Sequence, residues 1–321
     1  MPQRIDRRSF LEGSVAAAAL GAAGLSAGQA AAPAAGAKAT TSGLPKGRIG
    51  KLQVSRLLLG GNLLTHYTHS RDLRYVYDLT AHYNTPAKIL ETLALAEQNG
   101  IDTLSIHTVP SALKVLREHR EKHGGKMQWI ICPTAPVVEG LKAYEKQVRE
   151  LVDMGTEAIY LWGVHADGLA AGNQVKLIAG AVELAKKHGV PSGVGGHDLK
   201  VVKLCEEHKV PNDFYIKTFH HHNYPTGPKG DELKRPYNEF PGYWCQDPKE
   251  TAEVMARVEK PWIAFKVMAA GAIPPKNAFA YAFNGGADHV LAGMFDFEVV
   301  KDARTARWAV QSAKRTRPWR S

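Results

Sequence analysis

The chain has 321 residues, of which 44% are hydrophobic and 22% are charged, with 30 glycines and 18 prolines. This composition is typical of a globular protein and excludes a collagen-like repeat, a long coiled coil and disorder throughout. The net charge of +10 suggests nucleic-acid binding as one function. Much of the excess positive charge, however, lies in Lys314, Arg315, Arg317 and Arg320, and no nucleic-acid motif accompanies it. No nucleic-acid partner is therefore expected.

The N-terminus has the features of an export signal. Arg7 and Arg8 precede Ser-Phe-Leu and an apolar run rich in Ala and Gly, with small residues around 30–35 that suit cleavage. The run is too short and too rich in small residues for a stable membrane anchor. Residues 1–36 therefore resemble a twin-arginine signal peptide, which implies that the export machinery carries the folded protein to the periplasm or another extracytoplasmic space.

After a linker over residues 37–51, β-rich runs alternate with helical ones. Strands are predicted over residues 56–60, 102–107, 128–132, 158–164, 191–195, 213–219, 262–268 and 288–293. Amphipathic helices are predicted over 86–99, 138–154, 173–188 and 248–258. This alternation predicts a single (β/α)8 TIM barrel over 52–312, with a solvated basic tail over 313–321, and a doubly wound sheet is the alternative.

Two insertions lengthen loops of the predicted barrel, over residues 62–84 and 220–247. The second is rich in aromatic residues, which favours a lid over a small, sugar-like substrate, although the same rings could instead pin the loop to the barrel. Four residues of the insertions are predicted to contact substrate: Asn62, His66, Tyr243 and Trp244.

Histidines gather where the predicted strands end. Catalytic groups of such barrels lie at the C-terminal ends of the strands, and imidazole serves there as a metal ligand or as an acid or base. The rim residues of this kind are His107, His165, His197, His220 and His222, with Asp198 beside them and His69 in the first loop. The histidines of the helical stretches, at positions 119, 123, 188 and 208, are expected to be solvated.

Several segments, in order, resemble the aldo/keto reductase superfamily over nearly the whole mature chain. They are residues 54–60, 151–165, 194–198, 262–271 and 287–294. The resemblance implies a (β/α)8 barrel that binds NAD(P) and reduces carbonyls with a tyrosine acid assisted by Lys, Asp and His. It places the active-site histidine at His165, and the grip on the cofactor phosphate at Gly293 and Met294.

The family's other catalytic positions are changed. Ser105 stands where the Asp belongs, Pro110 where the Tyr belongs, and Pro133 or Thr134 where the Lys belongs. The Ser-Asn pair that holds the nicotinamide amide is replaced by Gly195-Gly196. Without a proton donor, ordinary hydride transfer to a carbonyl is not expected.

Four functions remain open. The first is a metal-assisted hydrolase, lyase or isomerase, with Zn²⁺ or a similar divalent ion held by the rim histidines and Asp198. The second is a Schiff-base lyase using Lys217 or Lys266, on adjacent predicted strands. The third is an oxidoreductase with remodelled NAD(P) binding and His165 or His107 as the acid. The fourth is a binding protein without catalysis. The three cysteines share no CxxC spacing, which argues against a disulfide framework and a thiolate metal cluster.

Overall fold

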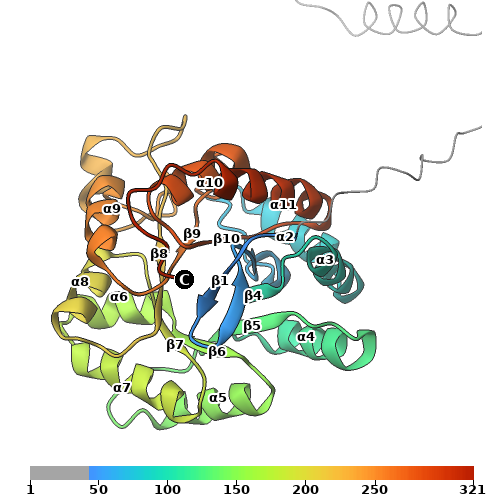
Figure 1. Ribbon diagram of the computed structural model, residues 1–321, viewed down its shortest axis with the longest axis horizontal. Helices are drawn as coiled ribbons and strands as arrows, with labels where there is room; N and C mark the ends of the chain where they lie inside the picture. The colour runs from blue at the N-terminus through green and yellow to red at the C-terminus, as the bar shows by residue number, and fades with distance from the viewer. Residues whose placement is uncertain (1–42) are drawn as a thin grey trace, which may run out of the picture. The chain divides into compact units, whose positions relative to one another are not determined.

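Eight parallel strands close into a barrel in the computed structural model, which describes residues 43–321 (Figure 1). The strands are β3 (Leu57–Gly60), β4 (Thr103–His107), β5 (Gln128–Cys132), β6 (Ala158–Leu161), β7 (Ser192–Gly196), β8 (Phe214–Thr218), β9 (Trp262–Phe265) and β10 (His289–Ala292). Pairing of β10 with β3 closes the ring, so the predicted (β/α)8 barrel is confirmed. The predicted signal peptide over 1–36 lies outside the described residues.

Helices surround the barrel and connect its strands (Figure 1). They are α2 (Tyr75–Tyr83), α3 (Pro86–Gln98), α4 (Pro110–His123), α5 (Lys142–Asp153), α6 (Gly163–Ala171), α7 (Val175–Lys187), α8 (Leu199–Glu207), α9 (Pro248–Arg257), α10 (Pro275–Asn284) and α11 (Asp296–Gln311). Two 3-10 turns lie in the insertions, η1 (Leu63–Thr65) and η2 (Gly230–Lys234). No helix among residues 43–321 is long and apolar enough to cross a membrane.

Local chemistry explains where several helices begin. The Thr85 side chain accepts a hydrogen bond from the backbone N–H of Lys88 at the start of α3, and Asp247 does the same for Glu250 at the start of α9. Proline occupies the first turn of both helices, where no intrahelical partner for its missing N–H is needed. At the other end of α4, Gly124 takes a left-handed conformation with φ of 69°.

A β-hairpin that the sequence analysis missed closes one end of the barrel. The strands β1 (Lys46–Ile49) and β2 (Leu52–Ser55) pair antiparallel around Gly50, whose φ is 57°. Ile49 and Val54 are fully buried and share one apolar cluster with inward-facing barrel residues such as Phe214. The predicted linker over 37–51 therefore includes, from residue 46 onward, a strand of the folded domain.

The C-terminal tail packs on the barrel, contrary to the solvated tail predicted over 313–321. In Figure 1 the C-terminus lies beside β1. The Arg317 side chain is buried, and its Nη1 lies 2.7 Å from Oδ2 of the fully buried Asp288. Arg315 and Arg56 both contact the ring of Trp319, with guanidinium carbons 3.5 and 4.0 Å from its centroid. Carbonyl and carboxylate acceptors at this end of the barrel explain why so basic a segment is held there.

Two strands end earlier than predicted, and both differences affect the mouth of the barrel. Strand β6 ends at Leu161, because α6 starts at Gly163, so His165 lies on a helix and not at a strand end. Strand β9 ends at Phe265, and Lys266 follows with φ of 54°. A left-handed non-glycine residue is unusual and tends to occur where a side chain is held for function.

Candidate active site at the barrel mouth

Lys266 is the central residue of the candidate site. It follows β9 at the C-terminal end of the barrel, where side chains from several loops converge. Its Nζ lies 5.1 Å from the ring centroid of Trp244 and 5.9 Å from that of Phe265. No ion pair or hydrogen bond of this Nζ is formed with any residue in 43–321. The amine is therefore enclosed by aromatic rings and is not committed to an acceptor.

The surroundings of Lys266 favour its neutral form. Burial lowers the pKa of the amine to about 7, and the carboxylates of Glu239 and Asp167 oppose this effect without cancelling it. Desolvation penalises the ammonium because the ion loses its hydration, while the free amine loses much less. At neutral pH a large fraction of Lys266 is thus an unprotonated amine, the form that attacks carbonyl carbon.

His197 is held beside Lys266 by Asp167. The Nδ1 atom of His197 lies 2.7 Å from Oδ2 of Asp167, and the other carboxylate oxygen accepts the backbone N–H groups of His197 and Asp198 at 2.9 and 3.0 Å. Burial and the charge of Lys266 lower the pKa of His197 to about 4. A proton on Nδ1 directed at the carboxylate leaves Nε2 as an acceptor, which is the arrangement of a general base.

A second histidine–carboxylate pair joins the two insertions. His69 Nδ1, from the first insertion, lies 2.6 Å from Oε1 of Glu239 in the second. The His69 ring contacts Trp244 edge-on at 5.3 Å. Burial lowers the pKa of His69 and the charge of Lys266 lowers it further, whereas Glu239 acts in the opposite direction. The pair places a neutral imidazole over the mouth and ties the lid across it.

An aromatic shelf, defined here as Trp162, His107 and His165, forms the opposite part of the mouth. The rings of His107 and Trp162 are nearly parallel, with an angle of 12° and centroids 6.3 Å apart. His165 meets Trp162 edge-on at 5.1 Å. All three residues are partly exposed. Desolvation lowers the pKa of both histidines. The shelf is thus uncharged at neutral pH and open to a ligand.

Lys217, predicted as an alternative nucleophile, is engaged in the packing. Its Nζ donates to the carbonyl oxygens of His197 and Thr218 at 2.8 and 3.0 Å, and to the Thr218 hydroxyl at 2.8 Å. The side chain is 1% exposed. Three acceptors fit an ammonium group, so its lone pair is not available for attack. Of the two predicted lysines, the geometry favours Lys266.

The predicted metal ligands are not assembled into a site. Among residues 43–321 no group of three or more His, Cys, Asp or Glu side chains could hold a metal ion. Four of the six are instead held by other groups of the protein, namely His197, His220, His222 and Asp198. His220 Nε2 accepts the backbone N–H of Trp244 at 3.0 Å, and His222 Nε2 lies 2.7 Å from the Cys245 carbonyl oxygen. Asp198 caps α8 through the N–H of Lys200.

The residues predicted to contact substrate divide into two groups. Tyr243 is fully buried, and its hydroxyl donates to the carbonyl oxygens of Glu232 and Arg235, so it pins the lid. His66 is similarly tied, with Nε2 2.9 Å from the carbonyl oxygen of Asn84. Trp244 is buried and forms the wall beside Lys266. Asn62 precedes η1 and is partly buried, without a side-chain hydrogen bond that caps the turn.

Side chains at and near the positions predicted to grip NAD(P) pack against the protein. Met294 is fully buried in the core, and the side chain of Glu298 accepts the N–H of Phe295 at the start of α11. At Gly293 a Cβ atom would make only an ordinary contact, 3.4 Å from Leu63. At Gly195 it would lie 2.9 Å from the backbone nitrogen of Gly163, so the serine of the reductase pattern would not fit without movement. These contacts argue against the reductase arrangement at this end of the barrel.

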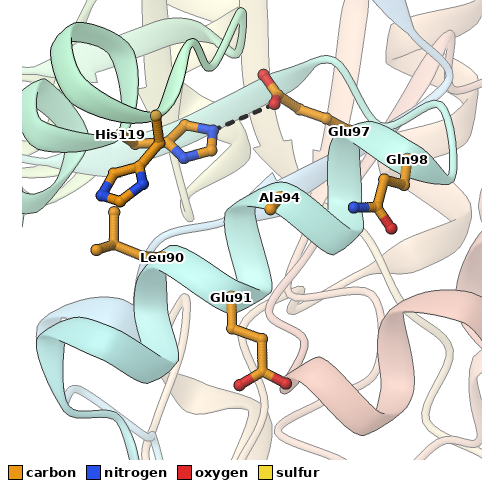
Figure 2. Close-up of a pocket in the computed structure, with 7 residues that line it drawn as sticks. Leu90, Glu91, Ala94, Glu97, Gln98 and His119 are labelled. Atoms are coloured by element: carbon orange, nitrogen blue, oxygen red, sulfur yellow. Dashed lines mark hydrogen bonds and ion pairs between the residues drawn. The ribbon is translucent and has the colours of Figure 1, made fainter.

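A surface hollow of about 430 Å³ between α3 and α4 lies on the helical exterior (Figure 2). In Figure 2 His119 points toward Glu97, with Nε2 3.2 Å from Oε2. The other Glu97 oxygen accepts the N–H of Lys126. His119 is 3% exposed, which corrects the prediction that it is solvated. Both groups fasten α4 to α3, so this part of the hollow has the contacts of helix packing.

Sequence reasoning named Lys266, His107, His165 and His197 but assigned no role to Asp167 or Glu239. Asp167 was recognisable as a carboxylate two residues beyond His165, near the mouth. Glu239 carried no local signal, because its partner His69 is 170 residues away in the chain.

Two solved structures show the same fold. One, described as "the putative aldo-keto reductase" from Pseudomonas aeruginosa, aligns with a TM-score of 0.54 at 15% identity over 83% of this chain and 96% of that chain. Another of that description and organism gives 0.53 at 17% identity over 84% and 96%. At these identities the likeness establishes the barrel and not the activity. No family model and no curated protein matches the chain.

Proposed function

We propose that the protein is a Schiff-base enzyme that cleaves or forms a carbon–carbon bond next to a carbonyl group, with Lys266 as the nucleophile. The observation that carries the proposal is a partly buried lysine at the barrel mouth whose amine lies against the rings of Trp244 and Phe265, has a pKa of about 7 and forms no hydrogen bond with residues 43–321. A neutral amine in an apolar pocket is the form required for attack on a carbonyl.

The proposed reaction is redox-neutral. The lone pair of Lys266 Nζ adds to the carbonyl carbon, the carbonyl oxygen leaves as water, and an iminium forms. A base then takes the proton of a hydroxyl group on the β-carbon, the bond between the α- and β-carbons breaks, and its electrons pass to the iminium nitrogen. Protonation of the resulting enamine and hydrolysis return the amine.

His197 and His69 are the groups placed to move these protons. Each imidazole is oriented by a carboxylate, Asp167 for His197 and Glu239 for His69. The charge of Lys266 lowers the pKa of both rings. When Lys266 is neutral this repulsion is absent, and both imidazoles become stronger bases. Loss of the proton from Lys266 therefore makes both histidines more ready to accept a proton.

Reductive trapping tests the proposal. The protein is incubated with dihydroxyacetone, glyceraldehyde or D-xylose, reduced with borohydride and digested, and the adduct is located by mass spectrometry. We expect a single adduct on Lys266, its loss in Lys266→Met, and its retention in Lys276→Met, a matched control at an exposed lysine. An adduct spread over surface lysines, or one that persists in Lys266→Met, would overturn the proposal.

A further inference from the structure

We propose that the substrate is an uncharged sugar or similar polyhydroxylated carbonyl compound, and that the aromatic shelf of Trp162, His107 and His165 binds its ring or carbon chain. This inference rests on the proposed function, because it assumes that the carbonyl end of the same molecule reaches Lys266. The shelf lies at the ends of β4 and β6, on different elements from the lysine.

The shape of the shelf suits a sugar. The indole of Trp162 is partly exposed, and a flat aromatic face packs against the C–H groups of a sugar ring. The His107 plane is almost parallel to it, and His165 stands against its edge. Apolar faces surrounded by ring nitrogens offer both contacts that a polyhydroxylated molecule requires.

Two of the shelf's polar groups are left without partners. The Nδ1 atom of His165 is buried and has no hydrogen-bond partner among the described residues. The His107 ring likewise forms no hydrogen bond with any residue from 43 to 321. A buried polar atom without a partner costs free energy, so such an atom at a mouth indicates a ligand that completes it. A hydroxyl group can donate or accept, and it therefore fits either tautomer of each ring.

The charges around the mouth favour an uncharged ligand. Arg71 donates to the carbonyl oxygens of Pro241 and Ala269, and Lys217 is held by three oxygen acceptors. A phosphate or carboxylate that paired with Lys266 would block the nucleophile. It would also face the carboxylates of Glu239 and Asp167, whose charges reach Lys266.

His69 connects the shelf to the lysine. Its charge acts on the pKa of His107, and the charge of Lys266 acts on the pKa of His69. His69 and Lys266 also have the ring of Trp244 as a common neighbour, at 5.3 Å for the His69 ring and 5.1 Å for the Lys266 Nζ. A molecule that extends from the shelf to Lys266 would pass under His69 and the lid residue Glu239.

Binding to the Lys266→Met protein tests the shelf separately from the chemistry, because no imine can form there. D-xylose, D-glucuronate, D-glucose 6-phosphate and benzaldehyde are titrated, and the imidazole signals of His107 and His165 are followed by NMR. We expect D-xylose to bind most tightly and to shift both signals. Trp162→Ala should weaken its binding tenfold or more, whereas Trp308→Ala, at an exposed tryptophan of α11, should leave it unchanged.

Tighter binding of an anionic sugar or of benzaldehyde, an unchanged affinity in Trp162→Ala, or no binding by any probe would overturn this inference. His165→Gln provides a second variant if Trp162→Ala does not fold, and it should weaken D-xylose binding several-fold. D-xylose binding without an adduct in the unmodified protein would refute the Schiff-base proposal and leave the shelf standing. An adduct on Lys266 that forms equally well in the shelf variants would refute the shelf inference and leave the Schiff-base proposal standing.

Discussion

The imidazole of His197 and the carboxylate of Asp167 meet at 2.7 Å at the bottom of the mouth, and the backbone N–H of His197 donates to the same carboxylate. This double attachment fixes both the position of the ring and its tautomer. Asp167 lies in α6, which begins two residues after β6 ends, so the early end of that strand is what brings the carboxylate to β7.

Asp167→Asn should reduce the rate of adduct formation at Lys266 about 10-fold or more while the protein stays folded. Asparagine retains an oxygen for the backbone N–H groups, but its amide removes the negative charge that holds His197, and such an orienting role is worth one or more orders of magnitude. The rate of borohydride trapping measures the effect. Asp153→Asn, at an exposed position, is the control. Equal rates in the two variants would show that Asp167 serves only packing.

The reactivity of Lys266 should rise with pH around a midpoint near 7, because burial lowers its pKa to about 7. Competitive labelling with a limiting amine reagent at pH 5.5–10, read by mass spectrometry, gives the profile of each lysine. Exposed Lys276 is read in the same experiment as the comparison. Coinciding profiles would mean that Lys266 is solvated.

Stability should follow the same titration. In the unfolded chain the Lys266 pKa returns to its ordinary value of 10.5, so between pH 7 and 10.5 the unfolded state binds more protons and the free energy of unfolding rises with pH. Lys266→Met should be more stable than the unmodified protein at pH 7 by about 2–4 kcal/mol, and this advantage should shrink toward pH 10.5. Urea unfolding at both pH values measures it, and a constant difference would contradict the assignment.

The sequence could predict the barrel because alternation of strands and helices is a local signal repeated eight times. It could also place His107 and Lys266 at the mouth, since both follow directly from strand ends. It could not predict how His220 and His222 would be used, because their partners are backbone atoms of Trp244 and Cys245 in the lid. A histidine that follows a predicted strand can therefore be placed at the barrel mouth from the sequence, but whether it binds a metal cannot.

The tail shows the same limit for charge. A run of arginines is usually solvated, yet Arg317 donates to the carbonyl oxygens of Met255, Gly286, Val258 and Lys260 and to the Asp288 carboxylate. The acceptor nearest to Arg317 in the sequence is Asp288, 29 residues away. The burial of Asp288 depends on its ion pair with Arg317, and no local sequence pattern predicts that pair.

Arg317→Met should lower the free energy of unfolding by about 3–5 kcal/mol. The change leaves Asp288 buried with a weaker set of partners, and breaking a buried pair on one side is costly because the remaining charge is uncompensated. Chemical unfolding measures the loss, and Arg304→Met, at an exposed position of α11, should change stability by less than about 0.5 kcal/mol. Similar values for both variants would mean that the tail is not part of the cooperative fold.

Acid should destabilise the protein between pH 6.5 and 4. Burial lowers the pKa of His197 and His289 to about 4 and that of His220 to about 3. Below pH 6.5 these three rings are therefore protonated in the unfolded chain while they are still neutral in the folded protein. Each contributes up to about 1.4 kcal/mol per pH unit. Burial raises the pKa of Asp302 to about 6 and also raises that of Glu157, and these two carboxyl groups act in the opposite direction.

His289→Asn isolates one of these contributions. His289 is fully buried, with Nδ1 2.9 Å from the Ser55 carbonyl oxygen and Nε2 2.6 Å from Ser321 Oγ. The variant should be less stable at pH 7 but should lose less stability on going to pH 5. Urea midpoints at the two pH values test this, with His123→Asn, at an exposed residue of α4, as the control. If the stability of the variant fell as steeply with pH as that of the unmodified protein, His289 would not contribute to the acid destabilisation.

Glu239→Gln should move the labelling midpoint of Lys266 below 7. Glu239 is the leading group that opposes desolvation at Lys266, so removing its charge lowers the pKa of the amine further. It also removes the negative charge from the acceptor that holds His69, so the contact weakens and hydrogen exchange in the lid around residues 236–241 should become faster. Glu253→Gln, in α9, is the control for both readouts, because its carboxylate is exposed and pairs with Lys249. If the labelling midpoint stayed at 7 while hydrogen exchange in the lid became faster, Glu239 would hold the lid in place without affecting the pKa of the Lys266 amine. If neither readout changed, the contact between His69 and Glu239 would not hold the two insertions together, and the lid would have to be positioned by Tyr243 and its carbonyl acceptors.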